Sequence, residues 1–202
     1  MTDAADIIIE IYRRHGLAWE SGRGRSLFEK VWLDRFQALL PCGGAVLDLG
    51  CGGADPLARY FIERGFVVTG VDTSPPLLGL ARERFPEHRW LPSDMRGLFL
   101  AERFNGILAW NSFFHLRCED QRRMFEVFRQ HAAPGAALMF TSGPAHGEAI
   151  GNLQGEPLFH ASLDGDEYRA LLDAHGFNVV AHVGEDPECN GHTVWLARAR
   201  LG

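Results

Sequence analysis

The sequence has little of what a nucleic-acid partner, a membrane or an oxidising compartment would require. Its 20 Lys and Arg residues are outnumbered by 26 Asp and Glu residues, and the net charge of −6 disfavours binding to nucleic acid or to a membrane surface. The four cysteines are spaced too widely for a disulfide framework or a zinc site. No apolar run is long enough to cross a bilayer, and the first residues do not resemble a signal peptide. We therefore expect a cytoplasmic protein with reduced thiols that binds a small molecule.

Length and periodicity predict one α/β domain. A chain of 202 residues, 46% of them hydrophobic, has the size of a single unit with a sizeable core, as a monomer or homodimer. After residue 44, short apolar runs alternate with helical patterns, which is typical of parallel strands joined by helices. We expect strands at 45–49, 66–71, 88–91, 104–110 and 136–141, with helices at 56–64, 75–84 and 118–131.

The predicted domain, residues 1–202, has four consecutive parts: a helical cap at 1–41, a core at 42–141, a glycine-rich lid or substrate loop at 142–163, and a helix with a hairpin at 164–202. In the cap we expect a helix at 3–15 that stops at Gly16, then a mobile loop at 17–25. A second helix opens with the capping box Ser26-x-x-Glu29. The late runs FNVVAHV and HTVWLARA predict an antiparallel hairpin at the edge of the sheet.

The stretch VLDLGCGGADP at 46–56 places three glycines between a buried strand and a helix start, with Asp55 suited to the N-cap and Pro56 to the first helical position. Open α/β sheets bind ligands at such loops. A phosphate loop would need Lys and then Ser or Thr where this chain has Ala54 and Asp55. A dinucleotide loop would need a small residue at 55, and an acidic side chain there would repel a pyrophosphate. Two interpretations of the loop remain: it binds a nucleoside without phosphate, or it is a tight turn with no ligand.

VLDLGCGGA resembles the glycine-rich first motif of the class I S-adenosylmethionine-dependent methyltransferases, whose usual third glycine falls at Ala54. The resemblance implies an α/β, Rossmann-like, mostly parallel sheet of seven strands in the order 3-2-1-4-5-7-6, with the last strand antiparallel and helices on both faces. It also implies S-adenosyl-L-methionine as cofactor and S-adenosyl-L-homocysteine as product. The cofactor contacts implied in this loop are Asp48, Gly50, Cys51 and Gly52.

Two further acidic residues extend the resemblance. Asp72, followed by Thr73, ends the run VVTGVDTS about twenty residues beyond the glycine loop, where an acidic side chain can bind a ribose diol. In LPSDMR the resemblance implies that Asp94 accepts the adenine amino group and that Met95 contacts the purine. Both acids also have a purely local interpretation, because Asp72 can precede a helix N-terminus and Asp94 can cap a turn.

The family's sheet order places the end of strand four, AWNSFFHL, beside the glycine loop. Trp110 is then expected at the cofactor, and Asn111, Ser112 and Phe114 at the substrate. His115 is the candidate catalytic base, since its ordinary pKa lies near neutrality, and a packing histidine is the alternative.

Candidates also lie in the flanking segments. Tyr12 is expected at the substrate, and Arg23 and Trp19 at the methionine end of the cofactor, where Arg23 would bind the carboxylate. A solvated arginine and a core tryptophan are the alternatives. Three polar residues of the long connection are expected to line the substrate pocket, unless they belong to an ordinary surface loop: His146, Glu148 and His160. Their spacing gives no recognisable metal site, so no metal is expected.

The acceptor is expected to be a small molecule. Strand four does not end in the N-P-P-Y or D-P-P-Y sequence of many amino-methylating nucleic-acid methyltransferases, and the paired-glutamate loop of protein arginine methyltransferases is not evident. We therefore predict a methyltransferase that acts on a small-molecule acceptor. The alternative is a noncatalytic S-adenosylmethionine-binding sensor or partner protein, whereas a nucleotide-dependent oxidoreductase is disfavoured by Asp55.

Overall fold

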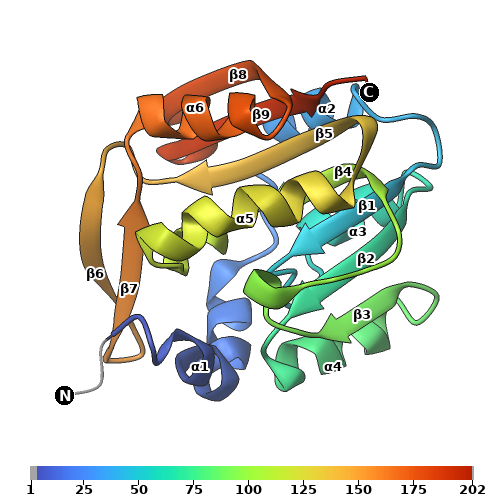
Figure 1. Ribbon diagram of the computed structural model, residues 1–202. Helices are drawn as coiled ribbons and strands as arrows, with labels where there is room; N and C mark the ends of the chain where they lie inside the picture. Colours follow the sequence, from blue (N-terminus) through green and yellow to red (C-terminus); the bar gives the residue numbers. More distant parts are fainter. Residues whose placement is uncertain (1–3, 202) are drawn as a thin grey trace.

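Seven strands form one sheet in the order β3-β2-β1-β4-β5-β9-β8 in the computed structural model, which describes residues 4–201 (Figure 1). In that order their bounds are Arg89–Pro92, Val67–Asp72, Ala45–Leu49, Phe104–Ala109, Ala132–Ser142, His192–Ala199 and Phe177–Asp186. The first five pair in parallel, whereas β9 runs antiparallel to both β5 and β8. The predicted strand order, with its antiparallel strand, is confirmed.

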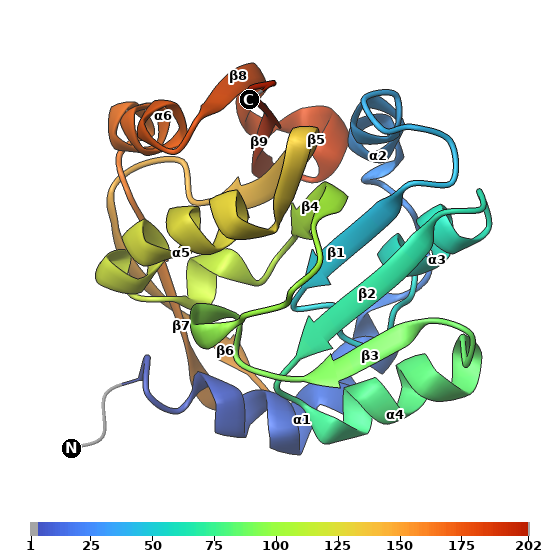
Figure 2. The same cartoon turned by 45° about the vertical axis from the view of Figure 1, so that its right-hand side comes forward.

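Helices cover both faces of the sheet, which explains why its central strands are apolar at nearly every position. In β1, for example, Val46, Leu47 and Leu49 are all fully buried. One face packs against α5 and α6, and the other against α2, α3 and α4 (Figure 2). The bounds of these five helices, from α2 to α6, are Lys30–Gln37, Leu57–Ile62, Pro75–Arg84, Cys118–His131 and Gly165–Ala174.

A long first helix and a two-stranded hairpin lie together at the end of the sheet toward which β1 and β2 point (Figure 1). The helix is α1 (Ile8–Arg23), and the hairpin pairs β6 (Gly147–Leu153) with β7 (Glu156–Ser162). α1 packs against α4 and against both hairpin strands. Arg14 and His15 of α1 reach the Glu156 carboxylate at 2.7 and 2.6 Å. These two elements therefore form one cover over the carboxyl ends of the strands.

The N-terminal region differs from the prediction. α1 continues through Gly16 to Arg23, so the predicted helix end and most of the predicted mobile loop are wrong; residue 3, where that helix was expected to begin, lies outside the described residues. Gly16 is buried, and a Cβ there would come within 3.0 Å of the Leu77 side chain, so this glycine permits close packing of α1 on α4. The predicted capping box is also wrong, because Glu29 makes no cap hydrogen bond and is ion-paired with Arg23 instead.

Two further local predictions are corrected. The connection at 142–163 is largely the β6–β7 hairpin and not a loop, and Gly151 gives room for the ring of His160 on the paired strand. Asp55 does not cap α3, because its carboxylate binds Arg59 through two hydrogen bonds of 3.0 and 3.1 Å. Among residues 4–201, no helix has both the length and the hydropathy to cross a membrane.

Candidate active site

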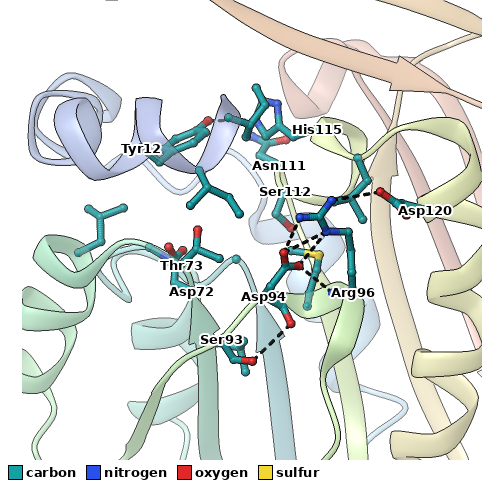
Figure 3. A pocket seen from close by; sticks show the side chains of 18 of the residues that line it. Tyr12, Asp72, Thr73, Ser93, Asp94, Arg96, Asn111, Ser112, His115 and Asp120 are labelled. Atoms are coloured by element: carbon teal, nitrogen blue, oxygen red, sulfur yellow. Dashed lines mark hydrogen bonds and ion pairs between the residues drawn. The ribbon is translucent and has the colours of Figure 1, made fainter. Parts of the chain in front are cut away.

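A cavity of about 190 Å³ lies between α1 and the carboxyl ends of the strands β1, β2, β3 and β4 (Figure 3). Each of these strands is followed by residues that line the cavity. Predicted site residues in its wall include Gly50, Asp72, Asp94, Asn111 and His115. Residues predicted separately from four strand ends therefore lie together in one wall of the cavity. The opposite wall is formed by α1 and the residues before it, which contribute side chains that the sequence did not single out, such as Ile8 and Ile9.

The glycine loop lines the cavity on one side and packs closely against other parts of the protein on the other. Gly50 has a positive φ of 80°, and a Cβ at this position would overlap the Cβ of Ser112. A Cβ on Gly52 would lie 3.5 Å from the ring of Trp19, and one on Gly53 would lie 2.6 Å from Glu20 Oε1. A side chain is thus excluded at Gly50 by Ser112 and crowded at Gly53 by Glu20 of α1, whereas Trp19 leaves ordinary contact distance at Gly52. The same close approach leaves the loop backbone bare toward the cavity.

Asp72 fastens the glycine loop to the next crossover. Its Oδ2 accepts a hydrogen bond from the Gly52 amide at 2.9 Å, and its Oδ1 accepts one from the Ser74 amide at 2.8 Å. Each carboxylate oxygen can accept a second hydrogen bond, so the side chain keeps acceptor capacity toward the cavity. Thr73 lines the cavity beside it. Burial raises the pKa of Asp72 despite these amide donors.

Asp94 is held by Arg96, a residue that the sequence analysis missed. Arg96 Nε donates to Asp94 Oδ2 at 3.0 Å, and Arg96 Nη1 donates to Asp120 Oδ2 at 3.2 Å (Figure 3). Burial acts to raise the pKa of Asp94, but the hydrogen bonds from Arg96 outweigh it, so the pKa lies below its usual value. Asp94 is therefore an ionised acceptor at the cavity wall, where Met95 lies beside it. The sequence did contain a signal for this contact, because Arg96 is the arginine that ends the motif LPSDMR.

Tyr12 of α1 and His115, which follows β4, come from opposite walls of the cavity and contact each other. The Tyr12 hydroxyl lies 3.0 Å from His115 Nε2 (Figure 3). On the other side of the ring, His115 Nδ1 lies 2.8 Å from the Phe159 carbonyl oxygen. Because a carbonyl can only accept, Nδ1 carries the proton and Nε2 accepts from Tyr12. Burial lowers the pKa of His115 to about 4, so the ring is neutral near pH 7. The hairpin strand β7, through Phe159, therefore fixes the tautomer of this histidine.

A second cavity of about 30 Å³ lies behind the glycine loop. It shares four residues with the larger cavity: Trp19, Gly50, Trp110 and Asn111. Asp48 and Cys51 line it as well, and burial together with the nearby charge of Asp72 raises the pKa of Asp48 to about 7. Arg23 also lines this cavity, but its guanidinium is ion-paired with Glu29. A single extended ligand bound against the loop would touch both cavities.

Unpaired polar atoms gather around this second cavity. Across residues 4–201, three buried side-chain polar atoms have no hydrogen-bond partner: Glu20 Oε2, Glu29 Oε2 and Trp110 Nε1. Glu20 and Trp110 line the cavity, and Glu29 holds the arginine that lines it. Native proteins leave few buried polar groups unpaired. This set of donors and acceptors therefore fits a ligand with a polar end. The amino-acid part of S-adenosylmethionine is such an end.

Of the other predicted substrate residues, only Ser112 lies in the cavity wall as the described residues define it. Phe114 and His160 pack against the His115 ring, each with a centroid distance of 4.8 Å, but neither is part of the cavity wall as the described residues define it. His146 and Glu148 are exposed at the start of the hairpin. Ser112 lines the cavity, and its hydroxyl donates to the Leu49 carbonyl at 2.6 Å. In the described part of the chain, no group of three His, Cys, Asp or Glu side chains is placed to bind a metal.

Known proteins share both this fold and parts of this sequence. The 1,6-didemethyltoxoflavin-N1-methyltransferase of Burkholderia thailandensis, solved with 1,6-didemethyltoxoflavin and S-adenosylhomocysteine, superposes with a TM-score of 0.75 at 20% identity, covering 99% of this chain and 92% of that one. The malonyl-[acyl-carrier protein] O-methyltransferase of Salmonella typhimurium is 36% identical over 99 residues, 48% of this chain and 38% of that protein. The ribosomal RNA small subunit methyltransferase H of Gemmatimonas aurantiaca is 32% identical over 123 residues, 55% of this chain and 38% of that protein.

The chain thus matches less than half the length of these two curated relatives. A family model described as a methyltransferase domain covers more of it, matching residues 22–182. That range includes the glycine loop, the strand ends that line the cavity and the β6–β7 hairpin. The chain belongs to the methyltransferase domain family.

Proposed function

We propose that this protein transfers the methyl group of S-adenosylmethionine to a hydroxyl oxygen of a small molecule. The observation that carries the proposal is the hydrogen bond between Tyr12 and His115 on the wall of the larger cavity. This pair provides a proton acceptor at the same cavity whose strand ends carry the residues that suit the cofactor. The family assignment supports methyl transfer, and the bound S-adenosylhomocysteine of the Burkholderia structure supports the choice of cofactor.

The polar groups around the glycine loop suit the parts of that cofactor. Asp72 would accept hydrogen bonds from the ribose diol, and Asp94 would accept one from the adenine amino group, with Met95 against the purine. Asp48 and Trp110 would lie near the methionine end. When bound there, S-adenosylmethionine supplies a methyl group activated on a sulfonium sulfur.

Tyr12 and His115 would then move the acceptor's proton. As the acceptor oxygen bonds to the methyl carbon, the bond from that carbon to sulfur breaks and its electron pair stays on sulfur. The proton of the acceptor passes to Tyr12 Oη, and the proton of Tyr12 passes to His115 Nε2. The imidazolium afterwards returns a proton to solvent. Tyr12 and His115 align the acceptor as well, which is the larger part of catalysing an in-line displacement.

The properties of His115 favour oxygen over an aliphatic amine as the attacked atom. With its pKa lowered to about 4 by burial, the ring holds an added proton only weakly. It would not remove a proton from an alkylammonium group, which must lose one before nitrogen can attack. A hydroxyl becomes a strong acid as methyl bonds to its oxygen, so even a weak base can take its proton at that stage.

A small acceptor fits the cover over the cavity. α1 and the residues before it close the cavity with apolar side chains, including Ile8 and Ile9. The net charge of −6 gives no attraction to the phosphates of an RNA acceptor. The carrier-bound acid and the ribosomal RNA named for the two curated relatives are therefore less suited to this cavity, and both are included in the test.

The proposal is tested by transfer of a labelled methyl group to pooled hydroxyl metabolites, pooled amines, malonyl-acyl-carrier protein and ribosomal RNA. Label is expected in the hydroxyl pool only, and label in the RNA or carrier arm alone would overturn the small-molecule assignment. With the acceptor found, Tyr12→Phe is expected to lower kcat about 100-fold or more, because it removes only the relay hydroxyl. Tyr60→Phe, which removes a hydroxyl bonded to Asp34 far from the cavity wall, serves as the matched control. Full turnover by Tyr12→Phe would eliminate the relay.

A further inference from the structure

The small cavity behind the glycine loop has more negative than positive side chains in its wall. Glu20, Asp48 and Asp55 contribute carboxylates, and Arg23 contributes a guanidinium. Three of these charges have an ion-pair partner, since Asp55 binds Arg59, Arg23 binds Glu29 and Glu20 binds Arg84 through Oε1. The acceptor capacity left in the wall residues is therefore that of Glu20 Oε2 and of the Asp48 carboxyl group. A cationic group of the ligand is the natural partner for it.

Glu20 is held rigidly with one oxygen in use and the other unpaired. Its Oε1 is ion-paired with Arg84, and Arg84 Nη1 also donates to the Gly53 carbonyl at 2.7 Å. The Glu20 side chain is only 9% exposed, and its Oε2 has no hydrogen-bond partner. Arg84 thus fastens Glu20 to the backbone of the glycine loop. A buried carboxylate oxygen in this position carries a desolvation cost unless a ligand donates to it.

Trp110 supplies the opposite kind of group at the same cavity. It is 5% exposed, and its Nε1–H is a buried donor without an acceptor. The ring is stacked on His192 at a centroid distance of 5.6 Å, which fixes its orientation. Two residues in the wall of one cavity of about 30 Å³, next to Gly50, therefore carry an unpaired acceptor and an unpaired donor. A compact group that carries both an ammonium and a carboxylate satisfies both.

We propose that Glu20 of α1 is the receptor for the α-ammonium group of S-adenosylmethionine, and that Trp110 Nε1–H donates to its carboxylate. This inference rests on the proposed function for the identity of the cofactor. The inference goes beyond the proposed function, because it assigns recognition of the cofactor's amino-acid end to a side chain of α1 that no sequence motif indicated. It also replaces the predicted carboxylate contact of Arg23, whose guanidinium is held by Glu29.

The test compares two ligands that differ only at this end. S-adenosylhomocysteine carries the amino-acid group, whereas 5′-methylthioadenosine has the same nucleoside and thioether without it. Their dissociation constants are measured by isothermal titration calorimetry on the full chain and on Glu20→Gln. Gln keeps an Oε1 acceptor for Arg84 but replaces the unpaired Oε2 by an amide that cannot accept. Glu10→Gln is the matched control, because it is the same change on an exposed residue of the same helix.

In Glu20→Gln, the Kd for S-adenosylhomocysteine is expected to rise about 10- to 100-fold, the usual effect of losing a hydrogen bond to a charged group. The Kd for 5′-methylthioadenosine is expected to change less than about twofold. Glu10→Gln should leave both constants unchanged. Trp110→Phe should likewise weaken S-adenosylhomocysteine more than 5′-methylthioadenosine.

Two results would overturn the inference alone. Equal affinity of wild-type and Glu20→Gln protein for S-adenosylhomocysteine would show that Oε2 receives no ligand group. Equal weakening of both ligands would show that Glu20 only holds Arg84 and the loop, and Arg84→Gln would then have the same effect. A different result would overturn the proposed function as well: no binding of S-adenosylhomocysteine to the wild-type protein, whatever the variants do.

Discussion

The two walls of the larger cavity are built differently. The sheet wall is tied by backbone hydrogen bonds, as where the Gly50 and Cys51 amides both donate to the Val71 carbonyl, at 2.7 and 3.1 Å. The helical wall, α1, has only Ile11 and Gly16 buried along its length. It is attached largely through side chains, including the contacts from Tyr12 to His115 and from Arg14 to Glu156.

The difference separates two tasks of the site. Backbone hydrogen bonds within a buried sheet open only when much of the fold opens, so the sheet wall holds in place the groups that we propose to bind the cofactor. The first half of α1, whose contacts with Glu156 are partly exposed, opens at lower cost than the second half, where Glu20 and Arg23 are in buried ion pairs. That first half is the part of the wall that can admit ligands. Changes in the sheet wall should therefore alter stability and binding strongly, and changes in the attachments of α1 should alter its local opening.

The largest effect is expected from Gly50→Ala. The added Cβ would overlap Ser112 and would sit at a positive φ, so we expect the free energy of unfolding to fall by about 2–5 kcal/mol, from overpacking and backbone strain together. Gly65→Ala is the control, because Gly65 has nearly the same φ and no atom within 4 Å of an added Cβ. It should lose only about 1–2 kcal/mol. Equal losses in urea denaturation would show that contact with Ser112 does not matter.

A smaller effect is expected from the pH dependence of binding at Asp48. Its pKa is raised to about 7 by burial and by the charge of Asp72, so below pH 7 it is mostly protonated in the free protein. A bound cation favours the carboxylate and lowers this pKa, so binding releases a proton and tightens as pH rises. The Kd for S-adenosylmethionine should fall about tenfold from pH 6 to pH 8.

Asp48→Asn provides the control for this linkage. It cannot ionise, so its Kd should change little over the same pH range. Calorimetry in two buffers of different ionisation enthalpy should detect about half a proton released by the wild-type protein near pH 7, where Asp48 is half protonated, and less by the variant. A wild-type Kd that stays flat across this range would contradict the assignment of the raised pKa to Asp48.

The sheet wall could be predicted from the sequence because its signals are local. Apolar runs such as VVTGV end directly in Asp72, and parallel strands bring such ends to one edge, so each candidate followed from its own strand. Gly50 was predicted to contact the cofactor. The structure adds that Ser112, which follows the neighbouring strand β4, already leaves no room for a side chain at Gly50.

The helical wall could not be predicted in the same way, because its contacts join residues far apart in the sequence. Arg14 and Glu156 are 142 positions apart, and the carbonyl that orients His115 belongs to Phe159. Local rules gave wrong results where tertiary contacts outweighed them. Gly16 was expected to end a helix but lies within one, and Glu29 was expected to cap a helix but is buried against Arg23.

The smallest effect is expected from Glu156→Gln, which removes the charge that Arg14 and His15 share between α1 and β7. Both contacts are partly exposed, so the free energy of unfolding should fall by less than about 1 kcal/mol. Hydrogen exchange of α1 amides should nevertheless become up to about fivefold faster, while amides of β1 and β4 keep their protection, because only the attachment of the helix is weakened. Glu102→Gln removes an equally simple ion pair with Arg89, away from α1, and should leave α1 exchange unchanged. Faster exchange in β1 and α1 alike would mean that the two walls open together, and the distinction between a fixed sheet wall and a movable helical wall would fail.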